Sequence, residues 1–317
     1  MKIFQQEVAT FSTSYRKHFP DTRCPQPAME NSVCQSAAAA FLAGALVRRF
    51  PLPKNLAPCS RASIYTAAIA GSALSQETVS GRQRRELAAN AVFEIEYPLR
   101  NTYGLTRFKK TAQLLKLLAA HSGTVLNHRQ ICTRLSTTAA TLSDYLAALQ
   151  AMDVITTISA WYEEDSGLGS KTPKVIFTDS ALAARLLGID AAAKLLTSFR
   201  LMDTVGATLV KTWAYNELLT GARCNPHWSV YHVRHKVSRT IDFLLTDDVG
   251  RHLGIEIKAA ESINPGDFRN LRWFAQRVPN FTGLVMYAGT QLLSFGNGCY
   301  AVPFSALWAQ NEAPIAS

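Results

Sequence analysis

Residues 228–260 read WSVYHVRHKVSRTIDFLLTDDVGRHLGIEIKAA, and this stretch decides the fold of the C-terminal part of the chain. In three segments of it, β-branched and aromatic residues alternate with polar ones, a pattern that predicts β-strands. The predicted strands cover residues 229–235, 239–246 and 252–258. The sequence Asp-Asp-Val-Gly at 247–250 predicts the turn between the last two.

Polar side chains at alternate positions of these strands predict a shared site. The period of two places Asp242 on one face of the second strand with Thr240 and Leu244. It likewise places Glu256 and Lys258 on one face of the third strand. We therefore expect two carboxylates and an ammonium group to converge.

The apolar residues around Glu256 predict that the third strand is largely buried. A buried carboxylate and a buried ammonium group cost free energy unless they are paired. A divalent cation held by Asp242 and Glu256 would account for them, with Lys258 activating a water molecule or stabilising charge on a phosphate. The alternative is a solvated Lys–Glu pair at the end of an edge strand, which would have a structural role only.

The residues TIDF at 240–243 and GIEIKA at 254–259 resemble the core of the restriction-endonuclease-like, or PD-(D/E)XK, superfamily. More narrowly, about the last two hundred residues resemble the C-terminal region of AAA-type ATPases that belongs to domain-of-unknown-function family DUF4143. Later landmarks are PGDFRNL at 265–271, GLVMY at 283–287, FGNG at 295–298 and AVPF at 301–304.

The resemblance implies a winged-helix segment followed by a nuclease-like domain that binds Mg²⁺ or Mn²⁺ and cleaves phosphodiesters. Asp242, Glu256 and Lys258 would be catalytic, with Asp242 and Glu256 as the metal ligands. Residues WAYNEL at 213–218 resemble the opening helix of the family, which makes Glu217 a further catalytic candidate. A surface role for Glu217 is the alternative.

The chain departs from the family pattern in one respect. No Gly-x-x-x-x-Gly-Lys-Ser/Thr motif occurs in the sequence, so we expect no intrinsic ATPase activity. An ATPase partner acting in trans would replace the missing domain. The rival to a nuclease is therefore a non-catalytic module that binds nucleic acid or such a partner.

Residues 106–190 have the pattern of a winged helix. A leucine stripe after Phe108 predicts a helix that ends at His121, and Asn127 can cap a second helix through Leu135. A third helix is predicted from Thr138 to Met152. Residues 154–162 and 174–178 are predicted to form a two-stranded wing around an acidic loop. The third helix carries no Arg or Lys between Leu135 and Asp153, so a packing or partner-docking role is preferred to sequence-specific DNA reading.

Basic side chains elsewhere could contact nucleic acid. Arg234, Lys236 and Arg239 lie at the predicted hairpin, and Lys171 and Lys174 lie at the wing. The net charge of +10 favours an anionic partner such as DNA, because it draws polyanions to the surface. A solvated basic surface is the alternative.

A length of 317 residues predicts two or three domains, and the element patterns together with the resemblance imply an α+β protein with three regions. These are an N-terminal helical region (1–105), a winged helix (106–190) and a restriction-endonuclease-like α/β domain with a mixed sheet (191–317). The six cysteines have neither zinc-site nor disulfide-framework spacing, and no signal peptide or membrane span is seen. A cytoplasmic protein is therefore expected.

Overall fold

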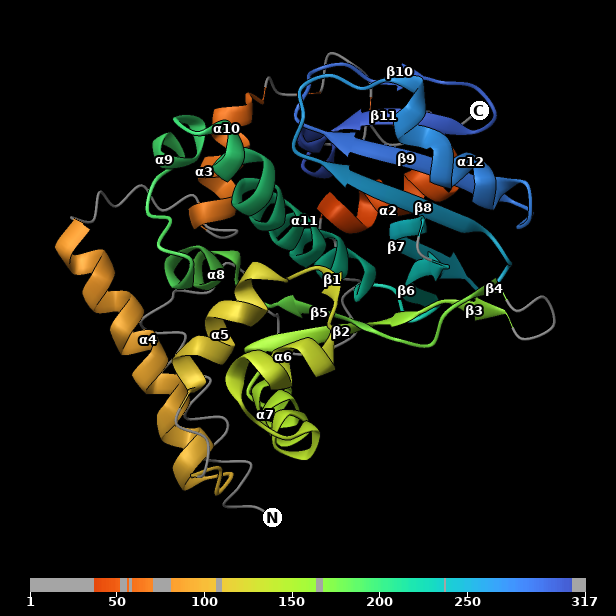
Figure 1. The fold of residues 1–317 in the computed structure, drawn as a ribbon. Coiled ribbons are helices and arrows are strands. Elements are labelled where there is room, and N and C mark those ends of the chain that lie inside the picture. The colour runs from red at the N-terminus through yellow and green to blue at the C-terminus, as the bar shows by residue number, and fades with distance from the viewer. Residues whose placement is uncertain are drawn as a thin grey trace, which may run out of the picture. The chain divides into compact units, whose positions relative to one another are not determined.

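The structure is a computed structural model that describes residues 37–51, 56, 59–70, 81–106, 110–163, 168–236 and 238–309, with the backbone alone for 81–90. The described residues form two compact units. Unit 1 is drawn from residues 66–157 and 174–213, and unit 2 from residues 26–65, 158–173 and 214–317. Figure 1 labels their helices and strands.

Unit 1 is mainly helical. Its helices are α4 (Gly81–Asn101), α5 (Thr111–Ala120), α6 (His128–Leu135), α7 (Ala139–Ala151), α8 (Ser180–Leu186), α9 (Ala192–Leu196) and α10 (Phe199–Leu201), followed by a π-helical turn, Met202–Gly206. Its strands are β1 (Thr124–Val125), β5 (Lys174–Phe177) and the first half of β2 (Ile155–Ala160), in the order β1-β5-β2. Strands β1 and β5 are antiparallel.

Local sequence explains where the helices of unit 1 begin. The Asn127 side chain accepts a hydrogen bond from the Gln130 amide, and the Thr138 hydroxyl accepts one from the Thr141 amide. Asn127 is the predicted N-cap, whereas Thr138, predicted as the first residue of the third helix, is its N-cap. Each satisfies an amide that has no partner inside its helix. The predicted second and third helices of this region are therefore confirmed.

Helix α4 contains a proline. It continues through Pro98 to Asn101. Proline removes one amide donor, and here it lies in the last turn, where the Pro98 carbonyl accepts hydrogen bonds from the Thr102 and Tyr103 amides. The cost of the proline is thus confined to the end of the helix.

Unit 2 is built around a mixed sheet with strand order β2-β6-β7-β8-β9-β11-β10. Its strands are β6 (Trp228–His235), β7 (Arg239–Asp247), β8 (His252–Lys258), β9 (Phe281–Tyr287), β10 (Leu293–Ser294) and β11 (Cys299–Pro303), with a separate hairpin of β3 (Tyr162–Glu163) and β4 (Leu168–Gly169). Strands β6, β7 and β8 form the predicted antiparallel meander. Strand β9 is parallel to β8.

Helices cover both faces of this sheet. Helix α12 (Arg269–Ala275), preceded by the 3₁₀ turn Pro265–Phe268, contacts β7, β8 and β9. Leu244 belongs to the core cluster on that side, whereas the neighbouring Phe243 contacts the Tyr215 ring of α11 (Ala207–Ala222). Since successive side chains of a strand point to opposite faces, α11 and α12 lie on opposite faces of the sheet.

An N-terminal segment completes unit 2. Helix α2 (Ala37–Leu46) contacts β8 and the turn Phe304–Leu307, whereas α3 (Arg61–Ala70) begins in unit 2 and ends in unit 1. The Arg48 guanidinium donates to the Phe281 carbonyl at 3.1 Å and to the Thr282 hydroxyl at 3.3 Å. Residues 37–65 therefore pack with the C-terminal region, although the sequence predicted a separate region over 1–105.

Two further findings concern a cysteine and the lengths of the described helices. Cys224, just after α11, is disulfide-bonded, which the cysteine spacing did not predict because a pairing depends on distance in space. Within the described ranges, no helix is both long enough and apolar enough to cross a bilayer.

Candidate active site

A β-bulge lies at Asp242. In the ladder between β6 and β7, Tyr231 pairs with Leu244 and Val233 pairs with Ile241, so His232 alone faces both Asp242 and Phe243. A bulge interrupts the alternation of side chains and redirects one of them. Accordingly, Ile241 and Leu244 belong to one core cluster although they are three residues apart.

The bulge corrects one expectation. Simple alternation predicted that Thr240, Asp242 and Leu244 share a face, but the extra residue breaks the period of two at Asp242. The position of the Asp242 carboxylate is fixed instead by a hydrogen bond. Its Oδ2 accepts from the Ile257 amide of β8 at 3.1 Å.

Asp242 and Glu256 are the next residues of β7 and β8 beyond the pair Phe243–Ile255. The Asp242 carboxylate, which is 5% exposed, therefore lies against the peptide that joins Glu256 to Ile257. Glu256 is half-buried on the neighbouring strand. The structure thus brings together the two carboxylates that the sequence singled out as metal ligands.

Tyr215 of α11 interacts with both carboxylate residues. Its hydroxyl donates to the Asp242 carbonyl at 2.6 Å, and its side chain is fully buried. Burial raises the pKa of Tyr215 well above its usual value, and the negative charges of Asp242 and Glu256 raise it further. The phenol therefore stays protonated and remains a donor beneath the carboxylates.

Lys258 ends β8 and pairs with a third carboxylate. Its Nζ lies 3.3 Å from Oδ1 of Asp267, and its side chain is 42% exposed. The other oxygen of Asp267, Oδ2, accepts from the Asn264 amide at 2.9 Å, and Asn264 caps the same turn through its own side chain. Asp267 is held in a capping box, so its carboxylate is a fixed partner for the ammonium group.

Glu217 lies on α11 two residues after Tyr215 and is half-buried. At about 100° of rotation per residue, the two side chains leave the helix about 200° apart. The contacts described above do not bring Glu217 to Asp242 and Glu256. Its role as a third catalytic carboxylate remains a prediction.

The predicted basic residues fall into two groups. Arg234, Lys236 and Arg239 flank the tip of the β6–β7 hairpin, where Lys236 is exposed with a φ of 54°. Exposed Lys171 lies 4.7 Å above the Tyr162 ring of β3. Lys174 is different, because it is only 6% exposed within β5, and this burial argues against the predicted phosphate contact.

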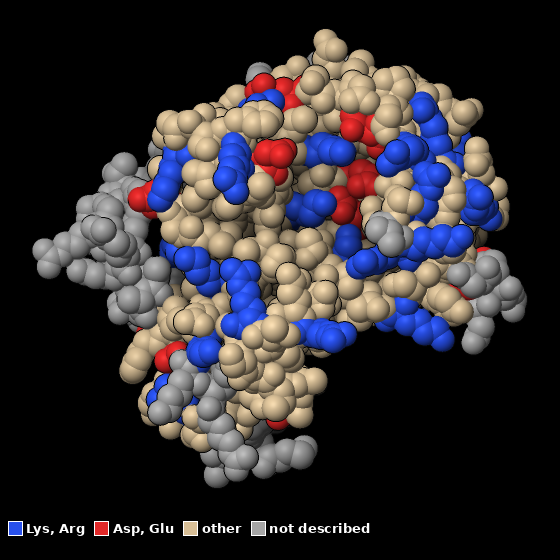
Figure 2. Space-filling model, in the orientation of Figure 1, with Lys and Arg blue, Asp and Glu red and all other residues tan. Residues whose placement is uncertain are grey.

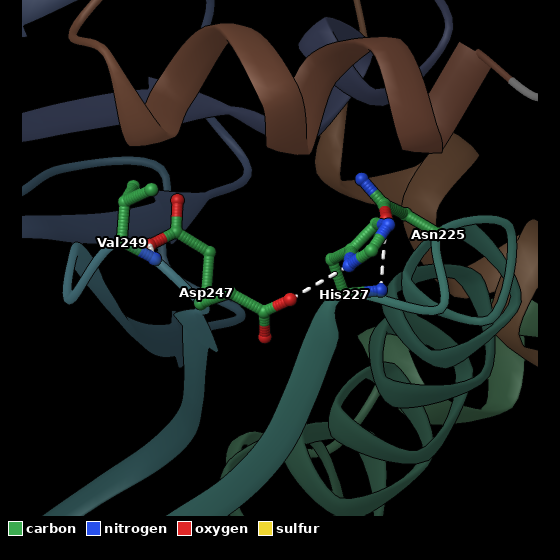
Figure 3. Close-up of polar contacts among 5 residues, drawn as sticks. Asn225, His227, Asp247 and Val249 are labelled. Atoms are coloured by element: carbon green, nitrogen blue, oxygen red, sulfur yellow. Dashed lines mark hydrogen bonds and ion pairs between the residues drawn. The ribbon is translucent and has the colours of Figure 1, made fainter.

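The histidines near the strands make separate contacts. His227 Nδ1 lies 2.6 Å from Oδ2 of Asp248 on the exposed turn, beside the Asn225 and Asp247 turns in Figure 3. Buried His232 donates through Nε2 to the Thr172 carbonyl at 3.0 Å, and Nδ1 of His235 accepts from the Gly169 amide. These contacts support structural roles.

The side chain of Arg272 on α12 joins two loops of unit 2. Its two terminal nitrogens donate to the carbonyls of Pro265 and Phe295, each at 3.1 Å, and its guanidinium lies over the Phe268 ring. It joins the turn before α12 to the loop before β11. Gln276 is exposed at the C-cap of α12.

Tyr215 and Asp267 were not among the predicted site residues. A buried tyrosine in a helix gives no signal of its own, because its hydrogen bond to Asp242 depends on tertiary packing. Asp267 did carry a signal, since Asn264 and Asp267 have the spacing of a capping box. Among the described residues, no group of three or more His, Cys, Asp or Glu has an arrangement that could hold a metal ion.

Comparison with known proteins identifies two family models and nothing more specific. No curated protein and no solved structure matches the chain. Residues 98–193 match the family described as "Domain of unknown function (DUF8612)". Residues 207–307, which contain the bulge, both carboxylates and Lys258, match the family described as "Domain of unknown function (DUF4143)", as their sequence predicted.

Proposed function

We propose that the chain is a metal-dependent nuclease that hydrolyses phosphodiester bonds of DNA. The observation that carries the proposal is the position of Asp242, whose carboxylate caps the Ile257 amide beside Glu256 on the next strand. Two neighbouring carboxylates at the end of a buried strand pair supply oxygen ligands of the kind that a divalent cation takes. The DUF4143 match covers this pair.

The proposed architecture has two parts. The order helix, three-stranded meander, helix and parallel strand in α11, β6–β8, α12 and β9 supports a restriction-endonuclease-like domain. The order α5-β1-α6-α7-β2-β5, with β1 antiparallel to β5, supports a winged helix. Neither family name states an activity, so fold and function are proposed together.

The donor set fits a magnesium or manganese ion. Mg²⁺ is commonly held by one or two carboxylates and keeps several water molecules, and Asp242 and Glu256 supply two carboxylates. When bound, the ion would supply Lewis-acid stabilisation of negative charge on the phosphate. Glu217 is retained as an assisting residue of this proposed site.

The residues of the chain would divide the remaining work. The Ile257 amide orients the Asp242 carboxylate, and the Tyr215 hydroxyl fixes the backbone of the same residue. Lys258 presents an ammonium group that can orient the attacking water or stabilise charge on the phosphate. Asp267 holds that ammonium group at the end of β8.

A non-catalytic module that binds nucleic acid or an ATPase partner in trans is the second candidate. The absence of Arg and Lys from α7 favours a docking role for unit 1, because a DNA-reading helix usually presents such side chains. The absence of a three-residue ligand group among the described residues also favours it. A protein of this kind would bind its partner and leave DNA intact.

Cleavage assays separate the two candidates. Supercoiled plasmid, linear duplex and single-stranded DNA are incubated with the chain in Mg²⁺, Mn²⁺ or chelator. We expect metal-dependent cutting that is lost in Asp242→Ala and Lys258→Ala and retained in the matched control Asp248→Ala, which removes an exposed aspartate of the same hairpin. Cutting that survives Asp242→Ala, or no cutting with any substrate, would reject the nuclease.

A further inference from the structure

Three side chains surround the indole ring of Trp273 on α12. The His235 ring stacks on it at 5.5 Å with an interplanar angle of 26°. The guanidinium carbons of Arg239 and Arg277 lie 5.7 Å and 5.0 Å from the centre of the same ring. Arg277 also donates to the Trp273 carbonyl at 2.8 Å. These contacts hold two guanidinium groups at fixed positions.

Lys236 and Arg234 lie on the same hairpin as Arg239. Arg234 points to the other face of the sheet, because it directly precedes His235 on β6. We call Lys236, Arg239 and Arg277, with Trp273 and His235, the cationic cluster. Lys236 and Arg277 are exposed, and Arg239 is half-buried. Figure 2 shows lysine and arginine side chains gathered over the region where Figure 1 draws β7, β8 and α12.

The charges of the cluster are not neutralised within the described ranges. No ion pair there joins any of its three cations to an aspartate or glutamate. Like charges gathered at one ring and one hairpin tip repel, and an anionic partner would relieve the repulsion. Guanidinium groups held against an aromatic ring keep planar donors for the oxygen atoms of a phosphate.

The cluster lies close to the proposed active site. Arg239 precedes Asp242 by three residues on β7, a distance of about 10 Å at about 3.3 Å per residue. One strand of a duplex carries a phosphate about every 3.4 Å along the helix axis, so this distance corresponds to roughly three nucleotides. Arg239 is the first residue of β7, the strand that carries Asp242, and α12 packs against β7 and β8.

We propose that the cationic cluster binds the phosphate backbone of the DNA strand roughly three nucleotides to one side of the bond to be cut, and that it does so without metal. The identification of the polyanion as DNA rests on the proposed function. Arg239 and Arg277 make the phosphate contacts, and Trp273 and His235 position them. The cluster therefore sets the register of the strand in the site.

The test is a binding measurement that needs no cleavage. Fluorescence anisotropy with labelled duplex and single-stranded oligonucleotides is recorded in chelator between about 50 and 200 mM salt. The double variant Arg239→Ala/Arg277→Ala is compared with the double variant Arg200→Ala/Arg223→Ala. The second removes the same charge from exposed arginines outside the cluster. Arg223 precedes the first residue of β6, at the end opposite the hairpin tip.

We expect the cluster variant to bind at least about tenfold more weakly and its salt slope on duplex to fall by about two, because each lost phosphate contact lowers that slope by about 0.9. The control variant should keep the affinity of the wild type within about twofold, because it keeps every phosphate contact. Trp273→Leu keeps the charges but releases the guanidinium groups, so it should weaken binding less. Thermal unfolding of each variant establishes that it is folded.

Several outcomes would overturn the inference. Equal weakening in both double variants would show that only net charge matters, and the absence of binding to either oligonucleotide would remove the partner. The proposed function fails separately. If the chain binds DNA through the cluster but cuts nothing in Mg²⁺, this inference stands and the nuclease proposal is rejected. If the chain cuts DNA and the cluster variant binds DNA as tightly as the wild type, the nuclease proposal stands and this inference is rejected.

Discussion

Replacing Tyr215 by phenylalanine tests how the site is held together. The change removes only the hydroxyl that donates to the Asp242 carbonyl at 2.6 Å in a fully buried setting. A buried acceptor left without its donor costs about 1–3 kcal/mol. At about 2–4 °C per kcal/mol for a domain of this size, a loss of about 2 kcal/mol lowers the melting temperature by roughly 4–8 °C.

The assay is urea unfolding followed by far-UV circular dichroism and tryptophan fluorescence, with Tyr145→Phe as the matched control. Tyr145 is 2% exposed, and its hydroxyl donates to the Leu105 carbonyl of unit 1 at 2.7 Å. Both variants should lose similar stability, because both remove a buried tyrosine-to-carbonyl hydrogen bond.

Only Tyr215→Phe should also reduce the rise in melting temperature caused by millimolar Mg²⁺, because ligand binding stabilises the native state through its own site. An unfolding free energy for Tyr215→Phe within about 0.5 kcal/mol of the wild type would refute the reasoning on stability. An equal loss of the magnesium effect in Tyr145→Phe would refute the link to the site.

Three further predictions follow from individual contacts. Gly254→Ala should destabilise unit 2 by roughly 1–3 kcal/mol, because a Cβ there would lie 2.5 Å from Cζ of the buried Phe281; wild-type urea unfolding would contradict this. Burial lowers the pKa of His252, so its neutral form is favoured in the native state. Stability should therefore fall as the pH drops below about 6.5 and through the lowered pKa, and His252→Gln should reduce that dependence in a pH series of melts. Asp267→Asn should slow cleavage by about tenfold through misplacement of Lys258, with recovery in Asp267→Glu; unchanged rates would assign Asp267 to the turn alone.

The meander and its neighbours could be predicted from the sequence because their signals are local. Alternation of apolar residues identified β6, β7 and β8, the cap Asn127 placed α6, and a stripe of apolar residues on one face placed α7. These features depend on residues a few positions apart. The proximity of Asp242 and Glu256 could also be predicted, because one short turn joins their strands β7 and β8.

Other features could not be predicted because they depend on contacts between distant segments. The bulge at Asp242 leaves the alternation pattern of β7 intact in the sequence, and it becomes visible only from the pairing with β6. The burial of Lys174 depends on the neighbours of β5, and the position of α2 depends on β8. Glu164 and Asp165, which belong to the acidic loop of the predicted wing, lie outside the described residues.

The packing of α2 on β8 has a consequence for synthesis on the ribosome. Leu46 ends α2 and His252 begins β8, so 206 positions separate the two elements along the chain (252 − 46 = 206). At about 5–20 residues per second, translation takes roughly 10–40 s to supply the strand that α2 covers. Throughout that interval the apolar helix, with Phe41 and Leu42, has left the ribosome before its partner exists. During synthesis, the apolar side chains of α2 are therefore exposed longer than those of later core elements of unit 2. We expect chaperones that bind nascent chains to bind this helix preferentially.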